Sequence, residues 1–123
     1  MRAKSKTLTE QELEIMKIVW ELGTATVREV YETLLRRRKI AYTTVMTMMN
    51  ILEEKGHLKK RAEDRAHVYR PAQAKTKVIQ ALLRDFVRRV FNGSAEPLLV
   101  HLVKQHDLTP QDLEEIAGMR RKP

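Results

Sequence analysis

The chain contains no cysteine among its 123 residues. Disulfide bonds and metal sites built on thiolates are therefore excluded, and nothing points to secretion. Its longest apolar runs are far shorter than the roughly 20 residues that a membrane-spanning helix requires. The N-terminal segment MRAKSK has no apolar stretch behind it, so it lacks the pattern of a signal peptide. Together these absences predict a soluble, cytoplasmic protein.

The sequence also lacks the motifs that would indicate catalysis. It has no nucleophile elbow, no glycine loop that would cradle a phosphate, and no carboxylate pair in a plausible cleft. Its four histidines have no recurring ligand spacing, and the HExxH motif is absent. We therefore expect a protein that is not an enzyme, holds no metal and needs no cofactor.

The chain does have an excess of basic residues. Lys and Arg number 24 against 16 Asp and Glu, which gives a net charge of +8. The bases cluster at residues 36–39 and 59–61, both within the first 71 residues. Such a charge suits a polyanionic partner such as nucleic acid, although it could also be a solvated surface.

Helix-capping signals divide the first half of the chain. Thr9 and Glu12 have the spacing of a capping box, and Thr26 and Glu29 repeat it. Gly23 lies where a glycine would end the first of these helices. A third helix is predicted from about Tyr42 to Gly56, with a buried stripe made by Val45, Met48, Met49 and Leu52.

Two short segments, residues 57–62 and 66–70, follow around the turn Glu63-Asp64-Arg65. Weak alternation predicts a hairpin whose inward positions are Leu58, Ala62, Ala66 and Val68. Three helices followed by a hairpin is the order of a winged helix-turn-helix.

Helical periodicity continues after Pro71. We expect a helix over residues 74–91, a second capped by Ser94, and a third capped by Thr109 with Pro110 at its first position. The fold class is therefore mainly α: an N-terminal winged helix-turn-helix over residues 7–71 and a C-terminal helical region over residues 72–123.

A winged helix-turn-helix places the start of its second motif helix against base edges in the major groove. The predicted base-reading residues are Ala41, Tyr42, Thr43, Thr44 and Thr47. The structural alternative is that Thr43 and Thr44 only cap their helix. The residues predicted to contact the DNA backbone are basic: Arg28, Lys55, Lys59, Lys60, Arg61 and Arg65.

Four segments carry a resemblance to a known family: LTEQELEIMKIVW, VREVYETL, AYTTVMTMMNILEEKGHLKK and DRAHVYRP. On these the chain resembles the penicillinase repressor family, also called the BlaI/MecI/CopY family, over about residues 7–118. The combination of AYTTV with LEEKG is more specific than the helical period that winged helices share. The segments VFNGS and LLVHLVKQHDLTPQDLEEI resemble the family's dimerisation region more loosely.

The resemblance implies a homodimeric transcriptional repressor that binds an inverted-repeat operator in double-stranded DNA and controls β-lactamase or related resistance or stress genes. Some members are inactivated when a membrane-bound, β-lactam-sensing metalloprotease triggers cleavage, so such a protease is a candidate partner. The aligned bond falls near His101–Leu102, where those members have Asn-Phe. The copper-responsive branch uses a cysteine cluster that this chain lacks.

The apolar stripe of residues 74–91 is too wide for a helix packed on one side only. We therefore expect the C-terminal helices to form the dimer through Val78, Leu82, Phe86, Val90, Leu98, Leu99, Leu102 and Val103. Two alternatives to a repressor stay open: a winged-helix protein-interaction adaptor, and a winged-helix regulator that senses a small molecule.

Overall fold

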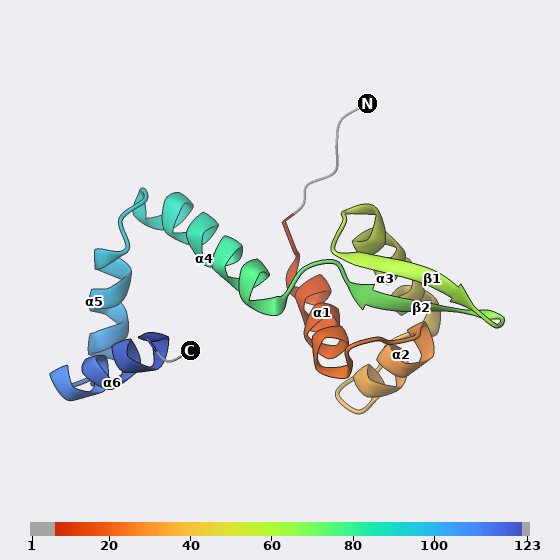
Figure 1. Ribbon diagram of the computed structural model, residues 1–123, viewed down its shortest axis with the longest axis horizontal. Helices are drawn as coiled ribbons and strands as arrows, with labels where there is room; N and C mark the ends of the chain where they lie inside the picture. The colour runs from red at the N-terminus through yellow and green to blue at the C-terminus, as the bar shows by residue number, and fades with distance from the viewer. Residues whose placement is uncertain (1–6, 122–123) are drawn as a thin grey trace. The chain divides into compact units, whose positions relative to one another are not determined.

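The computed structural model describes residues 7–121 as six helices and one hairpin (Figure 1). The elements are α1 Glu10–Leu22, α2 Val27–Leu35, α3 Tyr42–Glu54, β1 Leu58–Glu63, β2 Ala66–Pro71, α4 Lys75–Phe91, α5 Glu96–Gln105 and α6 Pro110–Arg121. The predicted fold class, mainly α with a winged helix-turn-helix at the N-terminal end, is confirmed.

Both predicted capping boxes are present at the starts of α1 and α2. The Glu12 amide donates to Thr9 Oγ1 over 3.1 Å, while the Thr9 amide donates to Glu12 Oε1 over 2.9 Å. Thr26 and Glu29 repeat this exchange at 3.2 and 2.8 Å. Each box satisfies two backbone amides that would otherwise lack a partner at the helix start.

The hairpin is antiparallel, with a register that runs from Leu58 opposite Pro71 to Glu63 opposite Ala66. The predicted inward positions are only partly right, because Tyr69 fills the core on β2 while Val68 is half-buried and Ala66 is exposed. Since Leu58 points inward and side chains alternate along a strand, the register places Tyr69, and not Val68, on the inward face.

Tyr69 also joins the hairpin of β1 and β2, which is the wing of this fold, to the connection between α1 and α2. Its amide donates to the Ala25 carbonyl over 2.8 Å, and the Ala25 amide donates to the Tyr69 carbonyl over 2.9 Å. Around this bridge, the three N-terminal helices and the hairpin bury a common core. Its largest fully buried side chains are Ile15, Met16, Val19, Val30, Leu34, Val45, Met49, Leu52, Leu58 and Tyr69. Met48, predicted to lie in this core, is only half-buried at its edge.

The chain divides into two compact units between Ile79 and Gln80, one turn inside α4. The first turn of α4 belongs with the N-terminal unit because Val78 is buried and Trp20 Nε1 donates to the Gln73 carbonyl over 3.2 Å. The division therefore lies later in the chain than the predicted boundary, which preceded α4.

The second unit consists of the rest of α4 with α5 and α6. Thr109 caps α6 as predicted, in a reciprocal exchange of backbone hydrogen bonds with Asp112. The predicted Ser94 cap is wrong: the residue before α5 is Ala95, which makes no side-chain capping bond. Within this unit the Phe91 ring lies 5.8 Å from that of Phe86 and 6.2 Å from that of His101, measured between centroids.

Candidate nucleic-acid interface

Helix α3 has one apolar side and one uncharged polar side. Val45 and Met49 are fully buried, whereas Thr43 and Thr47 are exposed. Each threonine lies two residues before one of the buried residues, which places it about 200° away around the helix. The side of α3 that faces solvent therefore presents hydroxyl and methyl groups.

All five predicted base-reading residues are exposed at or near the start of α3: Ala41, Tyr42, Thr43, Thr44 and Thr47. The N-cap of α3 is Ala41, and no side chain caps this helix start. The alternative that Thr43 and Thr44 serve only as caps is therefore wrong, and both hydroxyl groups remain available to a ligand.

Tyr42 is held in place by two neighbours from α2. Its ring meets that of Tyr31 edge to face at 5.4 Å, and the Arg28 guanidinium carbon lies 5.5 Å from its centroid. Arg28 also approaches Glu32 at 3.9 Å, but both side chains are mostly exposed, so that ion pair contributes little. The contact with Tyr42 thus places Arg28 beside the start of α3.

A hollow of about 590 Å³ lies between the start of α2, one flank of α3 and the hairpin. We call it the basic groove; it is lined by Thr26, Val27, Arg28, Tyr42, Met46, Asn50, Lys60, Arg65, Ala66, His67 and Tyr69. Three of these residues are Lys or Arg and none is Asp or Glu. Met46, on the flank of α3 that lines the groove, is 39% exposed.

The hairpin register separates the predicted basic contacts of the wing. Lys60 lies opposite Tyr69, on the face of the hairpin that lines the groove, while Lys59 and Arg61 alternate onto the other face. Arg61 is partly neutralised by Glu63, whose Oε2 lies 2.8 Å from its Nη2. Lys59, Lys60 and Arg65 have no ion-pair partner among the side chains described between residues 7 and 119.

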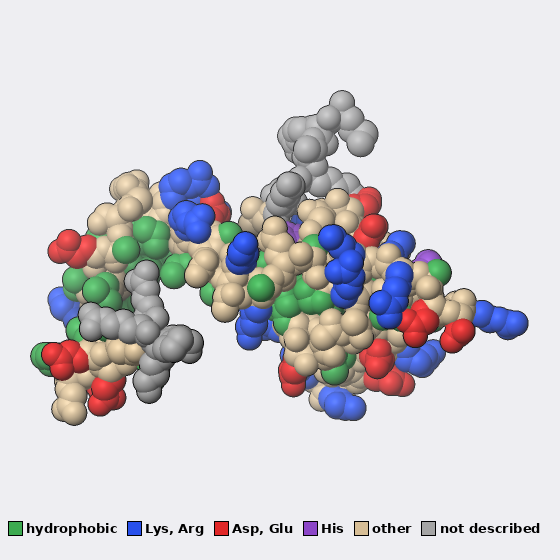
Figure 2. All heavy atoms as spheres, in the orientation of Figure 1, with side chains coloured by type: hydrophobic (Ala, Val, Ile, Leu, Met, Phe, Trp, Pro, Cys, Tyr) green, Lys and Arg blue, Asp and Glu red, His purple; other side chains and the backbone are tan. Residues whose placement is uncertain are grey.

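Basic side chains are visible over the hairpin and extend beyond its tip (Figure 2). The tip is the two-residue connection Asp64-Arg65, in which Asp64 has a φ of 54°. Arg65 is therefore at the hairpin tip, at one end of the basic groove.

Lys55 is nearly buried in an ion pair, which does not favour the DNA-backbone contact predicted for it. Its Nζ lies 2.8 and 3.0 Å from the two carboxylate oxygens of Glu12 and 3.2 Å from the Thr7 carbonyl, and its side chain is only 10% exposed. Burial alone would raise the pKa of Glu12, but the hydrogen bonds from Lys55 and Thr9 outweigh it and lower that pKa. This pair ties the end of α3 to the start of α1.

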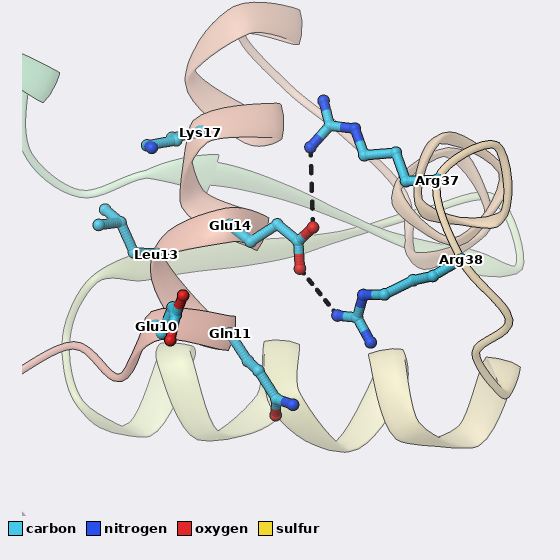
Figure 3. Close-up of a pocket in the computed structure, with 7 residues that line it drawn as sticks. All are labelled: Glu10, Gln11, Leu13, Glu14, Lys17, Arg37 and Arg38. Atoms are coloured by element: carbon cyan, nitrogen blue, oxygen red, sulfur yellow. Dashed lines mark hydrogen bonds and ion pairs between the residues drawn. The ribbon is translucent and has the colours of Figure 1, made fainter.

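The basic cluster of residues 36–39 is also partly neutralised. Figure 3 shows Glu14 between two of its members, with carboxylate oxygens 3.8 Å from Arg37 Nη1 and 2.7 Å from Arg38 Nη2. Glu10 and Lys17 line the same hollow. Since acidic and basic groups are mixed here, this surface suits an anion less well than the basic groove does.

Sequence reasoning missed a hydrogen bond between the wing and α3. The Tyr69 hydroxyl donates to Asn50 Oδ1 over 2.9 Å. Burial and the nearby charge of Glu53 raise the pKa of Tyr69, so the hydroxyl keeps its proton as a donor. The only sequence signal was an aromatic residue near the end of β2, which does not name its partner.

The predicted dimerisation residues fall into two groups. Val78 is buried within the N-terminal unit, which does not favour the dimer contact predicted for it. The others lie in the second unit and are half-buried or exposed: Leu82, Phe86, Val90, Leu98, Leu99, Leu102 and Val103. In the second unit, the exposed large apolar residues that the prediction did not include are Leu83, Val100, Ile116 and Met119. His101 and Leu102, the predicted cleavage position, are exposed in the middle of α5.

No helix within residues 7–121 is long and apolar enough to cross a membrane. The same residues contain no group of His, Asp or Glu side chains arranged to hold a metal ion.

The chain was compared with known proteins. It is 35% identical to the transcriptional regulator BlaI of Mycobacterium tuberculosis over 105 residues, covering 84% of this chain and 76% of that protein. It is 26% identical to the penicillinase repressor of Bacillus licheniformis over 113 residues, covering 92% and 88%.

Solved structures agree with these similarities. The solution structure of the DNA-binding domain of the repressor BlaI matches with a TM-score of 0.54 at 29% identity, over 61% of this chain and 92% of that one. Monomeric Bacillus licheniformis BlaI in complex with the blaP half-operator matches with a TM-score of 0.51 at 28% identity, over 61% and 89%. The model of the penicillinase repressor family matches residues 8–121, and the chain therefore belongs to this family.

Proposed function

We propose that this protein is a transcriptional repressor that binds double-stranded DNA through α3 and the hairpin. The observation that carries the proposal is the basic groove, which has cations and no carboxylate among its lining residues and adjoins the uncharged outward side of α3. Cations along a groove suit phosphates, and uncharged hydroxyl groups suit base edges.

A single helix such as α3 fits the major groove of DNA. The major groove of B-DNA is about 12 Å wide and admits one helix. Thr43 and Thr47 would face the bases, where a threonine hydroxyl can form a hydrogen bond and its methyl can meet that of thymine. Lys60 and Arg65 would contact phosphates from the wing.

The relatives support the same function. The Bacillus licheniformis relative is described as a monomer on a half-operator, which is the geometry expected for one reader on one half of a site. We propose that two copies of this chain bind an inverted repeat together, one copy on each half.

The second unit supports the homodimer. Leu99 is 50% exposed and Val90 55% exposed in the single chain, and more apolar side chains surround them. Apolar surface of this extent is typical of an interaction site. A second copy of the chain would cover it in a closed, two-fold arrangement that matches an inverted repeat.

The proposal for the target genes rests on the names of the relatives alone. Two of those names are penicillinase repressor and methicillin resistance regulatory protein MecI. We propose that this protein controls β-lactamase or related resistance genes in its own host.

The proposal is tested by selecting duplexes from a random pool and measuring how binding depends on salt. Phosphate contacts release counterions, so binding should weaken steeply as salt rises. Replacing Lys60 with Gln should reduce the slope of log K against log salt by about one unit. The matched control is Arg61→Gln, which should change the slope less because Glu63 already pairs with that arginine.

Two results would contradict the proposal. One is a failure to select any duplex from the pool. The other is binding that is insensitive to salt, which would indicate an adaptor for another protein and not a DNA reader.

A further inference from the structure

The basic groove lies where a DNA backbone would have to pass, if the proposed function is right. A helix in the major groove and a wing at the adjacent minor groove are separated by one sugar–phosphate strand. The basic groove is the hollow between those two elements. Residues that hold that strand would lie in this groove, and their role rests on the proposed function.

Asn50 lines this groove in a fixed orientation. It follows Tyr42 and Met46 at intervals of four residues, on the flank of α3 that faces the hairpin. Its Oδ1 accepts the Tyr69 hydroxyl proton over 2.9 Å. Because Tyr69 is only 2% exposed, its hydroxyl needs a protein acceptor, and an unsatisfied buried donor would be costly.

This bond determines which end of the amide remains available. With Oδ1 committed to Tyr69, the Nδ2 amino group is left to donate, and it has no hydrogen-bond partner among the side chains described between residues 7 and 119 or the described backbone. Asn50 itself is exposed. The structure therefore holds an oriented, uncharged donor in a groove that otherwise presents the cations Arg28, Lys60 and Arg65.

We propose that Asn50 is a phosphate-binding residue whose Nδ2 donates to a non-bridging oxygen of one DNA phosphate in the basic groove, with Tyr69 as the positioning residue. A phosphate oxygen is an acceptor only, which matches a group that can only donate. The apolar side chains of Tyr42 and Met46 in the same groove suit the carbon atoms of the adjoining deoxyribose.

A neutral donor has a signature that a cation lacks. Removing Asn50 should weaken binding to every duplex alike, because every duplex has the same phosphates. It should leave the salt slope unchanged, because no counterion-displacing charge is lost. Removing Lys60 should lower both the affinity and the slope.

The test compares the full-length parent with Asn50→Ala, Asn50→Asp and Tyr69→Phe. Asn50→Asp keeps the shape and the acceptor for Tyr69 but replaces the donor with a negative charge. Each protein is titrated with a duplex selected by the parent and with a mixed-sequence duplex of equal length. Single phosphates are then replaced in turn by uncharged methylphosphonates. Thermal unfolding of each variant separates loss of contact from loss of fold.

We expect Asn50→Ala to weaken binding to both duplexes by about tenfold with an unchanged salt slope, since a hydrogen bond to a charged group is lost. Asn50→Asp should weaken binding further while unfolding at the parent's temperature. At one methylphosphonate position the difference between parent and Asn50→Ala should disappear. Combining Tyr69→Phe with Asn50→Ala should bind no worse than Asn50→Ala alone.

Other results would overturn the assignment. If Asn50→Asp binds both duplexes as tightly as the parent, Asn50 touches no phosphate, while the parent's own binding leaves the proposed function standing. If the loss is confined to the selected duplex, Asn50 contacts a base. If the parent binds neither duplex, the assignment and the proposed function fall together.

Discussion

The two units of this chain differ in how completely they bury their apolar side chains. In the N-terminal unit, residues such as Val30, Val45 and Leu52 are wholly inaccessible to solvent. In the second unit no residue between positions 80 and 119 is buried, and Leu99 is half exposed. A folded unit without a buried core gains little stability from apolar contacts within its own chain. One unit thus buries a core within a single chain, while the other leaves its apolar side chains accessible, as the proposed dimer requires.

The two units also differ in how far apart in the sequence their paired polar side chains lie. The N-terminal unit orders its surface with long-range contacts, among them Lys55 with Glu12 and Tyr69 with Asn50. In the second unit the ion pairs are local, such as that of Arg89 with Asp85 at 3.0 Å, one turn apart on α4. Long-range contacts thus order the surface of the first unit, where we propose DNA binding, while the proposed dimer contacts lie in the second.

The largest expected effect comes from placing a charge in the apolar surface of the second unit. Leu99→Asp should prevent dimerisation and abolish tight operator binding, because the dimer would bury an unpaired carboxylate at a cost of several kcal/mol. Sedimentation and operator titration measure the two effects. The matched control is Leu22→Asp, since Leu22 is 49% exposed against 50% for Leu99 but lies at the end of α1. Equal behaviour of the two variants would remove the distinction between the units.

The next effect concerns the buried ion pair of the N-terminal unit. Lys55→Met should lower the free energy of unfolding by about 3–5 kcal/mol, because it leaves the Glu12 carboxylate buried without its partner. Denaturant unfolding of the full chain measures it. The double variant Glu12→Gln with Lys55→Met should recover much of the loss, and failure to recover would mean that Lys55 stabilises the unit through its packing.

Local signals explain how much of this fold was predictable. Thr9, Thr26 and Thr109 each identify a helix start with a partner three residues later, so short-range chemistry located α1, α2 and α6. Ser94 had the right residue type and the wrong position, because the helix begins after Ala95.

Contacts between distant residues could not be predicted in the same way. Lys55 and Glu12 are 43 positions apart, so composition alone assigned Lys55 to DNA. The inward face of β2 depended on the register with β1, which weak alternation did not determine, and Tyr69 was missed for that reason. The sequence predicted a DNA-binding surface on α3 and the wing, and that surface stays a proposal. Lys55, one of its predicted basic members, is paired with Glu12 instead.

A smaller effect should follow from changing the outward side of α3. Thr47→Ala should relax preference at one base pair of the selected operator by about 1–3 kcal/mol while leaving the unfolding temperature near that of the parent. Competition between operators that differ at single base pairs measures this. Thr24→Ala, an exposed threonine before α2, is the control and should change nothing. A parent-like base preference for Thr47→Ala would show that Thr47 does not read bases.

The smallest effect is the pH dependence of the N-terminal unit. The pKa of Glu12 is lowered from its usual 4.5, so the stability that its charged form contributes is present above that pH and is lost as pH falls through the lowered value. Denaturant unfolding between neutral pH and pH about 3 should show a smaller acid loss for Glu12→Gln than for the parent. Parallel curves for the two proteins would mean that the Glu12 charge contributes nothing to folding.

The difference between the two units is tested most directly by sedimentation equilibrium of the full chain beside a fragment of residues 1–79. The full chain should sediment at micromolar concentration with twice the mass of one 14.4 kDa chain, and the fragment should be a folded monomer. A monomeric full chain, or a fragment that dimerises by itself, would contradict the assignment of dimerisation to the second unit.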